Sequence, residues 1–275
     1  MVDQTTPLFD VRGLRIVYRR PGAKPLEAVR GVDFTLAEGE TLGIVGESGS
    51  GKSTIAKALM LLQPIAGGEA LFCGKDITRL DAAGRRAYRR DVQMVFQDAA
   101  GSLNPRMTIR QTLEEVLKFT AGGARGGQRP EDLLGIVGLS EAVLDQYPRE
   151  LSGGQCQRVS FARALAAGPR VLVADEPVSA LDVSVQARIL NLLRDLRRSL
   201  NLAVILIAHD LAVVRNVCDR VCVMHHGVFE DAGPAEDVFA RPTSDYTRRL
   251  LDAVPDVSRA LRARERVSER SGTNE

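Results

Sequence analysis

The residues best suited to chemistry lie in the segment GESGSGKST, which runs from Gly46 to Thr54. It fits the pattern G-x-x-x-x-G-K-[ST], and it follows an apolar segment and opens a helical one, as a phosphate-binding loop requires. Gly46, Gly49 and Gly51 would let backbone N–H groups converge on phosphate oxygens, and the helix N-terminus adds its positive end. A glycine turn that only caps a helix is the simpler alternative, but it leaves the lysine and serine at this spacing unexplained.

Lys52 and Ser53 have distinct tasks in such a loop. Lys52 would place a positive charge between the β- and γ-phosphates, and the Ser53 hydroxyl would ligate Mg²⁺. The whole segment, including Ser48, Ser50 and Thr54, is therefore the predicted binding site of a nucleoside triphosphate.

An acidic pair follows a second apolar segment, in the sequence VLVADEP. Asp175 and Glu176 would lie at the carboxyl end of a strand, where ligands of open α/β sheets collect. We expect Asp175 to hold the magnesium shell and Glu176 to orient and polarise the attacking water. The alternative is a pair of acids that caps the next helix.

Three further residues become candidates for the same site because of the phosphate loop and the acidic pair. Gln97 follows the apolar segment VQMVF and begins a helical region, so its amide could reach Mg²⁺ and report the nucleotide state. His209 ends the apolar segment LAVILIA and could donate to a γ-phosphate oxygen. Tyr18 could stack on adenine. Taken singly, Gln97 would more often be a surface residue, His209 a hydrogen-bonded core residue and Tyr18 a packing residue of a strand.

A second glycine pair stands in LSGGQCQRVSFARAL. Ser152 and Gln155 have the spacing of a capping box, and apolar residues follow at helical intervals, namely Val159, Ala162 and Leu165. Gly153 and Gly154 are therefore expected at an exposed helix N-terminus. This helix end is a second predicted anion site.

The pattern of apolar segments indicates an α/β fold. Between Leu8 and Leu36, short alternating segments separated by RRPGAKP predict antiparallel strands. Strands and helices then alternate, which predicts a largely parallel sheet. Residues 98 to 151 contain helical stretches instead, and the charged tail after Pro255 predicts a frayed helix or disorder. The expected parallel strands are TLGIV, VQMVF, VLVAD, AVILIA and VCVMHHG.

Composition excludes some functions. A formal net charge of +2 over 275 residues does not indicate a nucleic-acid-binding face. No apolar run approaches the roughly 20 residues that cross a bilayer, and the N-terminus lacks a secretory signal, so we expect a cytosolic chain. The four cysteines form no CxxC pair, which favours small buried hydrophobic residues over a zinc or iron–sulfur site.

Together these motifs resemble the ATP-binding cassette (ABC) ATPases, which carry the phosphate loop, the glutamine, LSGGQ, VLVADE, SALD (Ser179 to Asp182) and the histidine in the same order. The resemblance implies a RecA-like P-loop NTPase core with an N-terminal antiparallel β subdomain and an inserted α-helical subdomain at about 98–155. The cassette would span 1–255, followed by a charged tail at 256–275. It implies ATP and Mg²⁺ as ligands and adds Asp182 to the nucleotide-binding residues.

In that family two cassettes pack head to tail. Each LSGGQ then caps the ATP held by the phosphate loop of the other subunit. The resemblance therefore implies that the second anion site, Ser152 to Gln155, acts on the nucleotide of a partner.

Two further segments, RRDVQMVFQDAAGSLNPRMTI and GPAEDVFARPTSDYTRRLLDAVP, resemble the ATPase subunits of dipeptide, oligopeptide and nickel importers. The resemblance implies a peripheral subunit on the cytoplasmic face of the membrane, docked on two permease subunits through its helical insertion. It also implies a second, usually non-identical ATPase and an extracytoplasmic solute-binding protein as partners. Relatives with an iron–sulfur site carry a cysteine-rich tail, whereas the tail of this chain has no cysteine.

Two other classes of cassette compete with this reading. A cassette that acts on nucleic acid, in repair, chromosome maintenance or translation, is disfavoured because the chain has no long heptad arm, no zinc pair and no second cassette. An exporter cassette is disfavoured by the import-type segments. One departure from the family is Cys156, which follows LSGGQ where long polar or aliphatic residues are common.

Overall fold

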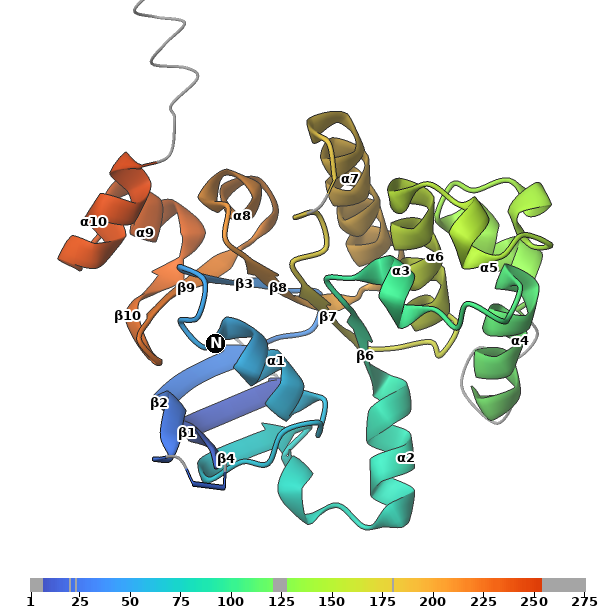
Figure 1. Ribbon diagram of the computed structural model, residues 1–275. Helices are drawn as coiled ribbons and strands as arrows, with labels where there is room; N and C mark the ends of the chain where they lie inside the picture. Colours follow the sequence, from blue (N-terminus) through green and yellow to red (C-terminus); the bar gives the residue numbers. More distant parts are fainter. Residues whose placement is uncertain (1–6, 20, 23, 121–127, 180, 254–275) are drawn as a thin grey trace, which may run out of the picture.

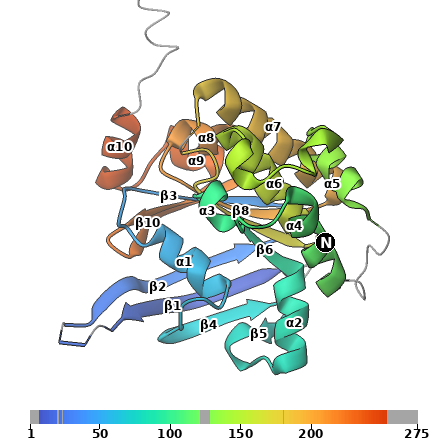
Figure 2. The same cartoon turned by 45° about the vertical axis from the view of Figure 1, so that its right-hand side comes forward.

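Two β-sheets organise the chain in the computed structural model, which describes residues 7–19, 21, 22, 24–120, 128–179 and 181–253. Figure 2 shows the smaller sheet below α1 and the larger sheet between α1 and a layer of helices that includes α6, α7 and α8. The mixed α/β architecture is the one predicted. The expectations for the glycine-rich AGGARGGQ, which covers 121–128, and for the tail at 256–275 concern segments almost wholly outside the described residues.

The smaller sheet is antiparallel, with the order β2-β1-β4-β5. Its N-terminal strands were predicted, whereas β4 and β5 were not. The β4 segment, GGEALF, begins with two glycines and has no apolar alternation, so it becomes a strand only by pairing with β1. The strands are β1 (Phe9–Tyr18), β2 (Leu26–Leu36), β4 (Gly67–Phe72) and β5 (Lys75–Asp76).

The larger sheet has the order β10-β9-β3-β8-β7-β6. All of its pairs are parallel except β10 with β9, so the prediction of a largely parallel sheet is confirmed. The unpredicted strand is β10, whose sequence VFEDAGP ends in two residues that are poor strand formers. The strands are β3 (Thr41–Val45), β6 (Val92–Val95), β7 (Val171–Asp175), β8 (Ala203–Ala208), β9 (Arg220–His225) and β10 (Val228–Pro234).

Helices occupy the region predicted as a helical insertion, on the side of β6 (Figure 1). The expected boundary at 155 falls inside α6, which continues to Leu165 and packs against α3, α4 and α5. Within the described ranges no helix is both long and apolar enough to cross a bilayer. The α-helices are α1 (Lys52–Leu59), α2 (Ala82–Asp91), α3 (Ala99–Ser102), α4 (Ile109–Thr120), α5 (Pro130–Ile136), α6 (Gly153–Leu165), α7 (Val183–Leu200), α8 (Leu211–Val217), α9 (Ala235–Ala240) and α10 (Asp245–Asp252).

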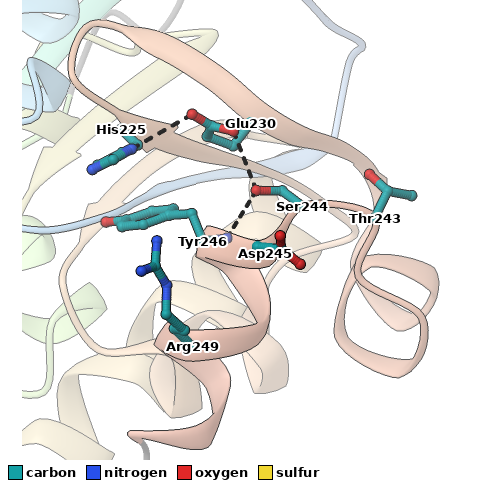
Figure 3. A pocket seen from close by; sticks show the side chains of 7 residues that line it. All are labelled: His225, Glu230, Thr243, Ser244, Asp245, Tyr246 and Arg249. Carbon is teal, nitrogen blue, oxygen red and sulfur yellow. Dashed lines mark hydrogen bonds and ion pairs between the residues drawn. The ribbon is translucent and has the colours of Figure 1, made fainter.

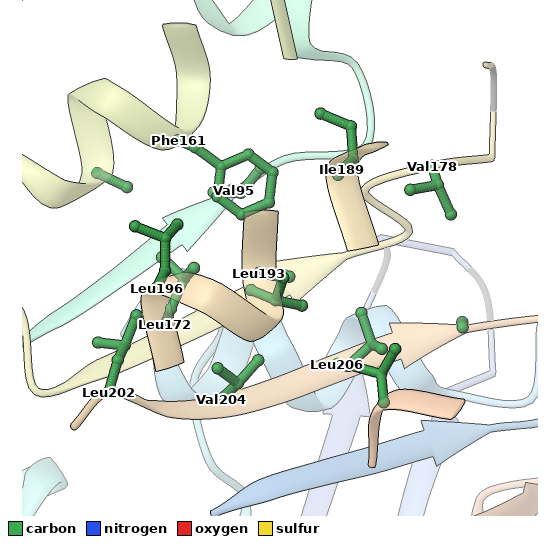
Figure 4. Close-up of a cluster of buried hydrophobic side chains, with 14 of the residues drawn as sticks. Val95, Phe161, Leu172, Val178, Ile189, Leu193, Leu196, Leu202, Val204 and Leu206 are labelled. Carbon is green, nitrogen blue, oxygen red and sulfur yellow. The ribbon is translucent and has the colours of Figure 1, made fainter. Parts of the chain in front are cut away.

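The central strands contribute side chains to two hydrophobic cores, because successive side chains of a strand point to opposite faces of the sheet. Val171 and Val173 of β7 join the core formed with α1 and the antiparallel sheet. Leu172 and Ala174 of the same strand join the core formed with the helices of the other face. Figure 4 shows part of this second core, where Phe161 of α6 lies among side chains of β6, β7, β8 and α7.

One prediction about the cysteines is wrong. Cys156, Cys218 and Cys222 are buried as expected, but Cys73 is exposed. Cys73 lies in the turn between β4 and β5 with φ of +49°, and its sulfur is 3.1 Å from Nη1 of Arg170. The turn between β4 and β5 holds Cys73 at the surface, and the spacing of the cysteines in the sequence does not reveal that turn.

The Phe161 side chain, which is fully buried, ties the helical layer to the larger sheet. We expect Phe161→Ala to lower the free energy of unfolding by about 3–5 kcal/mol, because it leaves a cavity. Chemical denaturation of the purified chain would measure this loss. Phe119 of α4 is 86% exposed, so the matched change Phe119→Ala should stay within about 0.5 kcal/mol. Equal effects at the two positions would contradict this account of the core.

Candidate active site

The phosphate loop connects β3 to α1, as predicted, and it is packed tightly from outside. Gly46 has φ of +147°, and a Cβ atom there would lie 2.0 Å from the carbonyl oxygen of Met224 at the end of β9. A side chain at this position would therefore collide with backbone that cannot move aside. The glycine spacing of the motif reflects this packing as well as the space that phosphate needs.

Lys52 is the first residue of α1, and it is only 4% exposed. Its Nζ donates to the carbonyl oxygens of Gly46 and Glu47, both at 2.8 Å. Burial lowers the pKa of Lys52, while the neighbouring carboxylates of Glu176 and Asp175 act in the opposite direction. The structure therefore places a buried ammonium group against the backbone of the phosphate loop.

Ser53 and Asp175 meet although they come from distant parts of the sequence. The Ser53 hydroxyl donates to Oδ1 of Asp175 at 2.9 Å, and Asp175 is 6% exposed at the end of β7. Burial raises the pKa of Asp175, and the hydrogen bond from Ser53 acts against that rise. A hydroxyl and a buried carboxylate in contact form an oxygen donor set of the kind that Mg²⁺ prefers.

Glu176, Gln97 and His209 converge at one point. Nε2 of Gln97 donates to Oε2 of Glu176 at 2.8 Å, and Nδ1 of His209 lies 3.7 Å from the same oxygen. The Glu176 side chain is 17% exposed, whereas that of His209 is 57% exposed. The structure thus brings together the three residues that the sequence nominated as catalytic.

The backbone of Glu176 is strained. Its φ is +46°, a conformation that costs a non-glycine residue about 1–3 kcal/mol. The surrounding structure fixes it, because Glu176 N–H donates to the Ile207 carbonyl at 2.9 Å and Ser179 N–H donates to the Glu176 carbonyl at 3.3 Å. This turn directs the Glu176 carboxylate toward Gln97 and His209, away from the path of a regular strand.

Tyr18 and Ser50 complete the surroundings of the loop. Tyr18 ends β1, is half-buried, and has its hydroxyl 3.3 Å from that of Thr54. Tyr18 therefore adjoins the phosphate loop, and its stacking on adenine stays a prediction. The Ser50 hydroxyl is buried and finds no hydrogen-bond partner among the described residues. A buried hydroxyl without a partner inside this loop fits the binding of a polar ligand such as a phosphate group.

The LSGGQ segment forms the start of α6, and its predicted capping box is confirmed. Ser152 Oγ accepts from Gln155 N–H at 3.3 Å, and Gln155 Oε1 accepts from Ser152 N–H at 2.9 Å. Ser152 and Gly153 are exposed, while Gly154 is buried against Val185 of α7. Because α6 packs against α3, α4, α5 and α7, this helix end belongs to a different part of the fold from the phosphate loop.

Cys156 and Asp182 both have local roles. Cys156 is buried beside LSGGQ, with its sulfur 3.5 Å from the Pro148 carbonyl. Asp182 caps α7, because its Oδ1 accepts from Val185 N–H at 2.9 Å and from the Ser184 hydroxyl at 2.7 Å. The hydrogen bond from Ser184 is the main cause that lowers the pKa of Asp182. The contribution of Asp182 to nucleotide binding stays a prediction.

Sequence reasoning missed several neighbours of the site. Ser179, the first residue of the SALD motif, received no role from the sequence, yet its hydroxyl lies 3.5 Å from Nε2 of Gln97. Tyr246 of α10 accepts from Glu47 N–H at 3.2 Å, and Gly227 N–H donates to the Ser50 carbonyl at 2.9 Å. The only signal for Tyr246 was its place in a segment that resembles importer ATPases. No motif marked Gly227.

The arrangement suits the transfer of a phosphoryl group to water. Buried Lys52 and the loop N–H groups can bind phosphate oxygens, and Glu176 is placed to accept a proton, with Gln97 and His209 at its carboxylate. Phosphoryl transfer depends mainly on positioning and electrostatic stabilisation, which these residues supply together.

Comparison with known proteins supports this reading. The family model for ABC transporters matches residues 29–179. The oligopeptide transport ATP-binding protein OppF of Lactococcus lactis is 46% identical over 241 residues, which covers 87% of this chain and 76% of that protein. A putative peptide import ATP-binding protein of Brucella ovis is 46% identical over 253 residues, covering 91% and 79% of the two chains.

Solved structures show the same fold. A dimeric structure of MJ0796, a bacterial ABC transporter cassette, has a TM-score of 0.74 at 31% identity and covers 82% of this chain and 98% of that one. A second dimeric structure of MJ0796, in a post-hydrolysis state bound to ADP and Pi, has a TM-score of 0.72 at 30% identity with the same coverage. On the strength of its motifs, its fold and these relatives, the chain belongs to the ABC transporter family.

Proposed function

We propose that this chain is the ATP-hydrolysing subunit of an ABC importer that takes up di- or oligopeptides. The observation that carries the proposal is the meeting of Gln97 and His209 at the Glu176 carboxylate, next to the phosphate loop. The relatives from Lactococcus lactis and Brucella ovis are named for oligopeptide transport and peptide import, which favours peptides over nickel as the cargo.

Each residue of the site has a task in the proposed reaction. Lys52 holds the β- and γ-phosphates, and the N–H groups of Gly46 and of Ser48 to Gly51 surround them. Glu176 accepts a proton from the attacking water, while Gln97 and His209 hold its carboxylate and the γ-phosphate region in place. Tyr18 contacts the adenine ring.

Mg²⁺ is the expected metal of this site. Ser53, Asp175 and Gln97 would hold it, and the ion would neutralise negative charge on the phosphates. The contact between Ser53 and Asp175 supports this assignment, because it already joins two oxygen ligands.

The proposal includes a partner cassette. Ser152 and Gly153 are exposed at the N-terminus of α6, so the LSGGQ segment is free to cap a nucleotide bound to a second subunit. MJ0796, a cassette of similar fold, forms a dimer in its solved structures. Asp182 lies on the same side of the fold as LSGGQ, since α7 contacts α6 through Val185 and Gly154.

The remaining partners follow from the proposed transport function. We propose a non-identical second ATPase, two membrane permeases, an extracytoplasmic solute-binding protein and a peripheral location on the cytoplasmic face of the membrane. The helical region from α3 to α6 would contact the permease, with Gln97 at its start. No observation favours a role on nucleic acid.

Replacement of Glu176 by glutamine should leave ATP binding intact but lower the turnover rate at least a hundredfold, because glutamine cannot accept the proton. ATPase assays and titration of ATP into the purified complex would measure both quantities. Glu69 is exposed on β4 of the smaller sheet, whereas Glu176 follows β7 of the larger sheet, so Glu69→Gln is the matched control and should hydrolyse ATP normally. Normal turnover by Glu176→Gln would remove Glu176 from its role as base.

Replacement of Lys52 by alanine should weaken ATP binding roughly 10- to 150-fold, the value of a hydrogen bond to a charged group. Lys118 of α4 has a side chain that is 77% exposed, so Lys118→Ala provides a control with the same loss of charge away from the site. Equal ATP affinities of the two variants in a binding titration would count against the assignment of Lys52.

The proposed head-to-tail arrangement predicts where a photoreactive γ-phosphate analogue of ATP should react. In the Glu176→Gln complex, the analogue held by one phosphate loop should label the peptide from Ser152 to Gln155 on the other subunit. Mass spectrometry distinguishes the two chains by sequence, or by isotope if they are identical. Labelling of the Ser152–Gln155 peptide in the same molecule whose phosphate loop holds the analogue would exclude the arrangement.

A further inference from the structure

The C-terminal helix α10 reaches the phosphate loop through one side chain. Tyr246, only 7% exposed, places its hydroxyl oxygen 3.2 Å from the backbone nitrogen of Glu47, whose N–H donates to it. Glu47 is the second residue of the phosphate loop, whereas Tyr246 lies almost at the end of the described chain. A buried contact between such distant segments acts directly on the backbone of the loop.

The same peptide unit of the loop also contacts Lys52. The Gly46 carbonyl, which belongs to the peptide bond with Glu47 N–H, accepts from Nζ of Lys52 at 2.8 Å. Because a peptide unit is planar, fixing the direction of its N–H also fixes the direction of its C=O. Tyr246 on one side and Lys52 on the other therefore hold one peptide plane, beside a glycine with φ of +147° that restrains it little.

Tyr246 itself is held on several sides. Its ring stacks on that of His225, with centroids 3.9 Å apart and planes inclined by 14°. Its backbone N–H donates to the Ser244 hydroxyl at 3.1 Å, and Ser244 N–H donates to the carboxylate of buried Asp231 at 3.1 Å. Figure 3 shows the ring between His225 and the Arg249 side chain, on the wall of a surface pocket.

A second residue from the C-terminal part of the described chain also contacts the backbone of the phosphate loop. Gly227, in the turn that follows His225, donates its N–H to the Ser50 carbonyl at 2.9 Å. The outer side of the phosphate loop is thus held at Glu47 and at Ser50 by residues of the β9–β10–α10 region. Neither contact uses the groups that the proposed function assigns to phosphate.

From this geometry we propose that Tyr246 is a positioning residue for ATP hydrolysis, which fixes the Gly46–Glu47 peptide and through it the ammonium group of Lys52. The inference rests on the proposed function of the phosphate loop. It assigns to α10 a part in nucleotide binding, beyond the packing of a C-terminal helix. A partner that displaces α10 would loosen the loop by the same route.

Tyr246→Phe tests the inference because it removes the hydroxyl and keeps the ring on His225. Loss of one hydrogen bond predicts that the Kd of ATP and the KM for ATP rise roughly fivefold, while kcat stays unchanged. ADP should weaken by the same factor, whereas AMP, which lacks the β-phosphate, should bind as before. Binding titrations and ATPase assays on the full chain with its partner subunits provide these values.

Tyr88→Phe is the matched control. The Tyr88 hydroxyl donates to the Leu59 carbonyl at the far end of α1, so its loss removes a buried hydrogen bond without touching the phosphate loop. This variant should lower the melting temperature and leave KM and Kd for ATP unchanged. Hydrogen exchange adds a direct readout, since the Glu47 amide should lose protection in Tyr246→Phe while the β3 amides keep theirs.

Several outcomes would overturn the inference. Unchanged nucleotide affinity of Tyr246→Phe would do so, as would a lower kcat and melting temperature with unchanged KM, which would mean a purely structural role. If Tyr246→Phe fails to fold, His225→Ala removes the stacking partner instead, and an unaltered exchange rate at Glu47 together with unaltered ATP affinity would overturn it. Failure of the unmodified chain to bind ATP would reject the proposed function itself, which separates the two failures.

Discussion

Parallel pairing of β3, β8, β7 and β6 is the constraint on which the site depends. The register pairs Val45 with Ala208 and Asp175 with Ile207, so these strands end along one edge of the sheet. The residues that follow each strand must then lie near one another, although the chain visits them in a different order. The sheet therefore brings Glu176 and His209 to the edge at which the phosphate loop begins.

Burial of charged groups at this edge of the sheet costs desolvation free energy. Lys52 and Asp175 are 4% and 6% exposed. Burial lowers the pKa of Lys52 and raises that of Asp175, which favours the neutral form of each group. Backbone carbonyls offset part of the cost at Lys52, and the Ser53 hydroxyl does so at Asp175. A polyphosphate and a divalent cation would satisfy both groups further, so the features that limit stability are those that favour the ligand.

The sequence predicted those parts of the site whose chemistry is tied to strand ends, and it missed parts fixed by tertiary contact. Gln97, Asp175, Glu176 and His209 each follow an apolar segment, which made their convergence predictable. Tyr246 meets Glu47 only because α10 packs against β10 and its ring stacks on His225 at the end of β9, and nothing in its local sequence reports that contact. The same reason explains β4, β5 and β10, which become strands through pairing with β1, β4 and β9 rather than through their own composition.

The phosphate loop and the start of α6, the two proposed anion-binding elements, differ in exposure, and this difference bears on how the proposed dimer could switch. Lys52 is buried in its own chain, whereas Ser152 and Gly153 are exposed to solvent at the end of α6. Pairing hydrated groups with a γ-phosphate yields only about 1.5–3 kcal/mol for each charged hydrogen bond. Moving a two-state equilibrium from 1:99 to 99:1 needs about 5.5 kcal/mol, so a few such bonds suffice. In the proposed dimer, hydrolysis would remove the γ-phosphate that these bonds hold and would thereby reverse the closure.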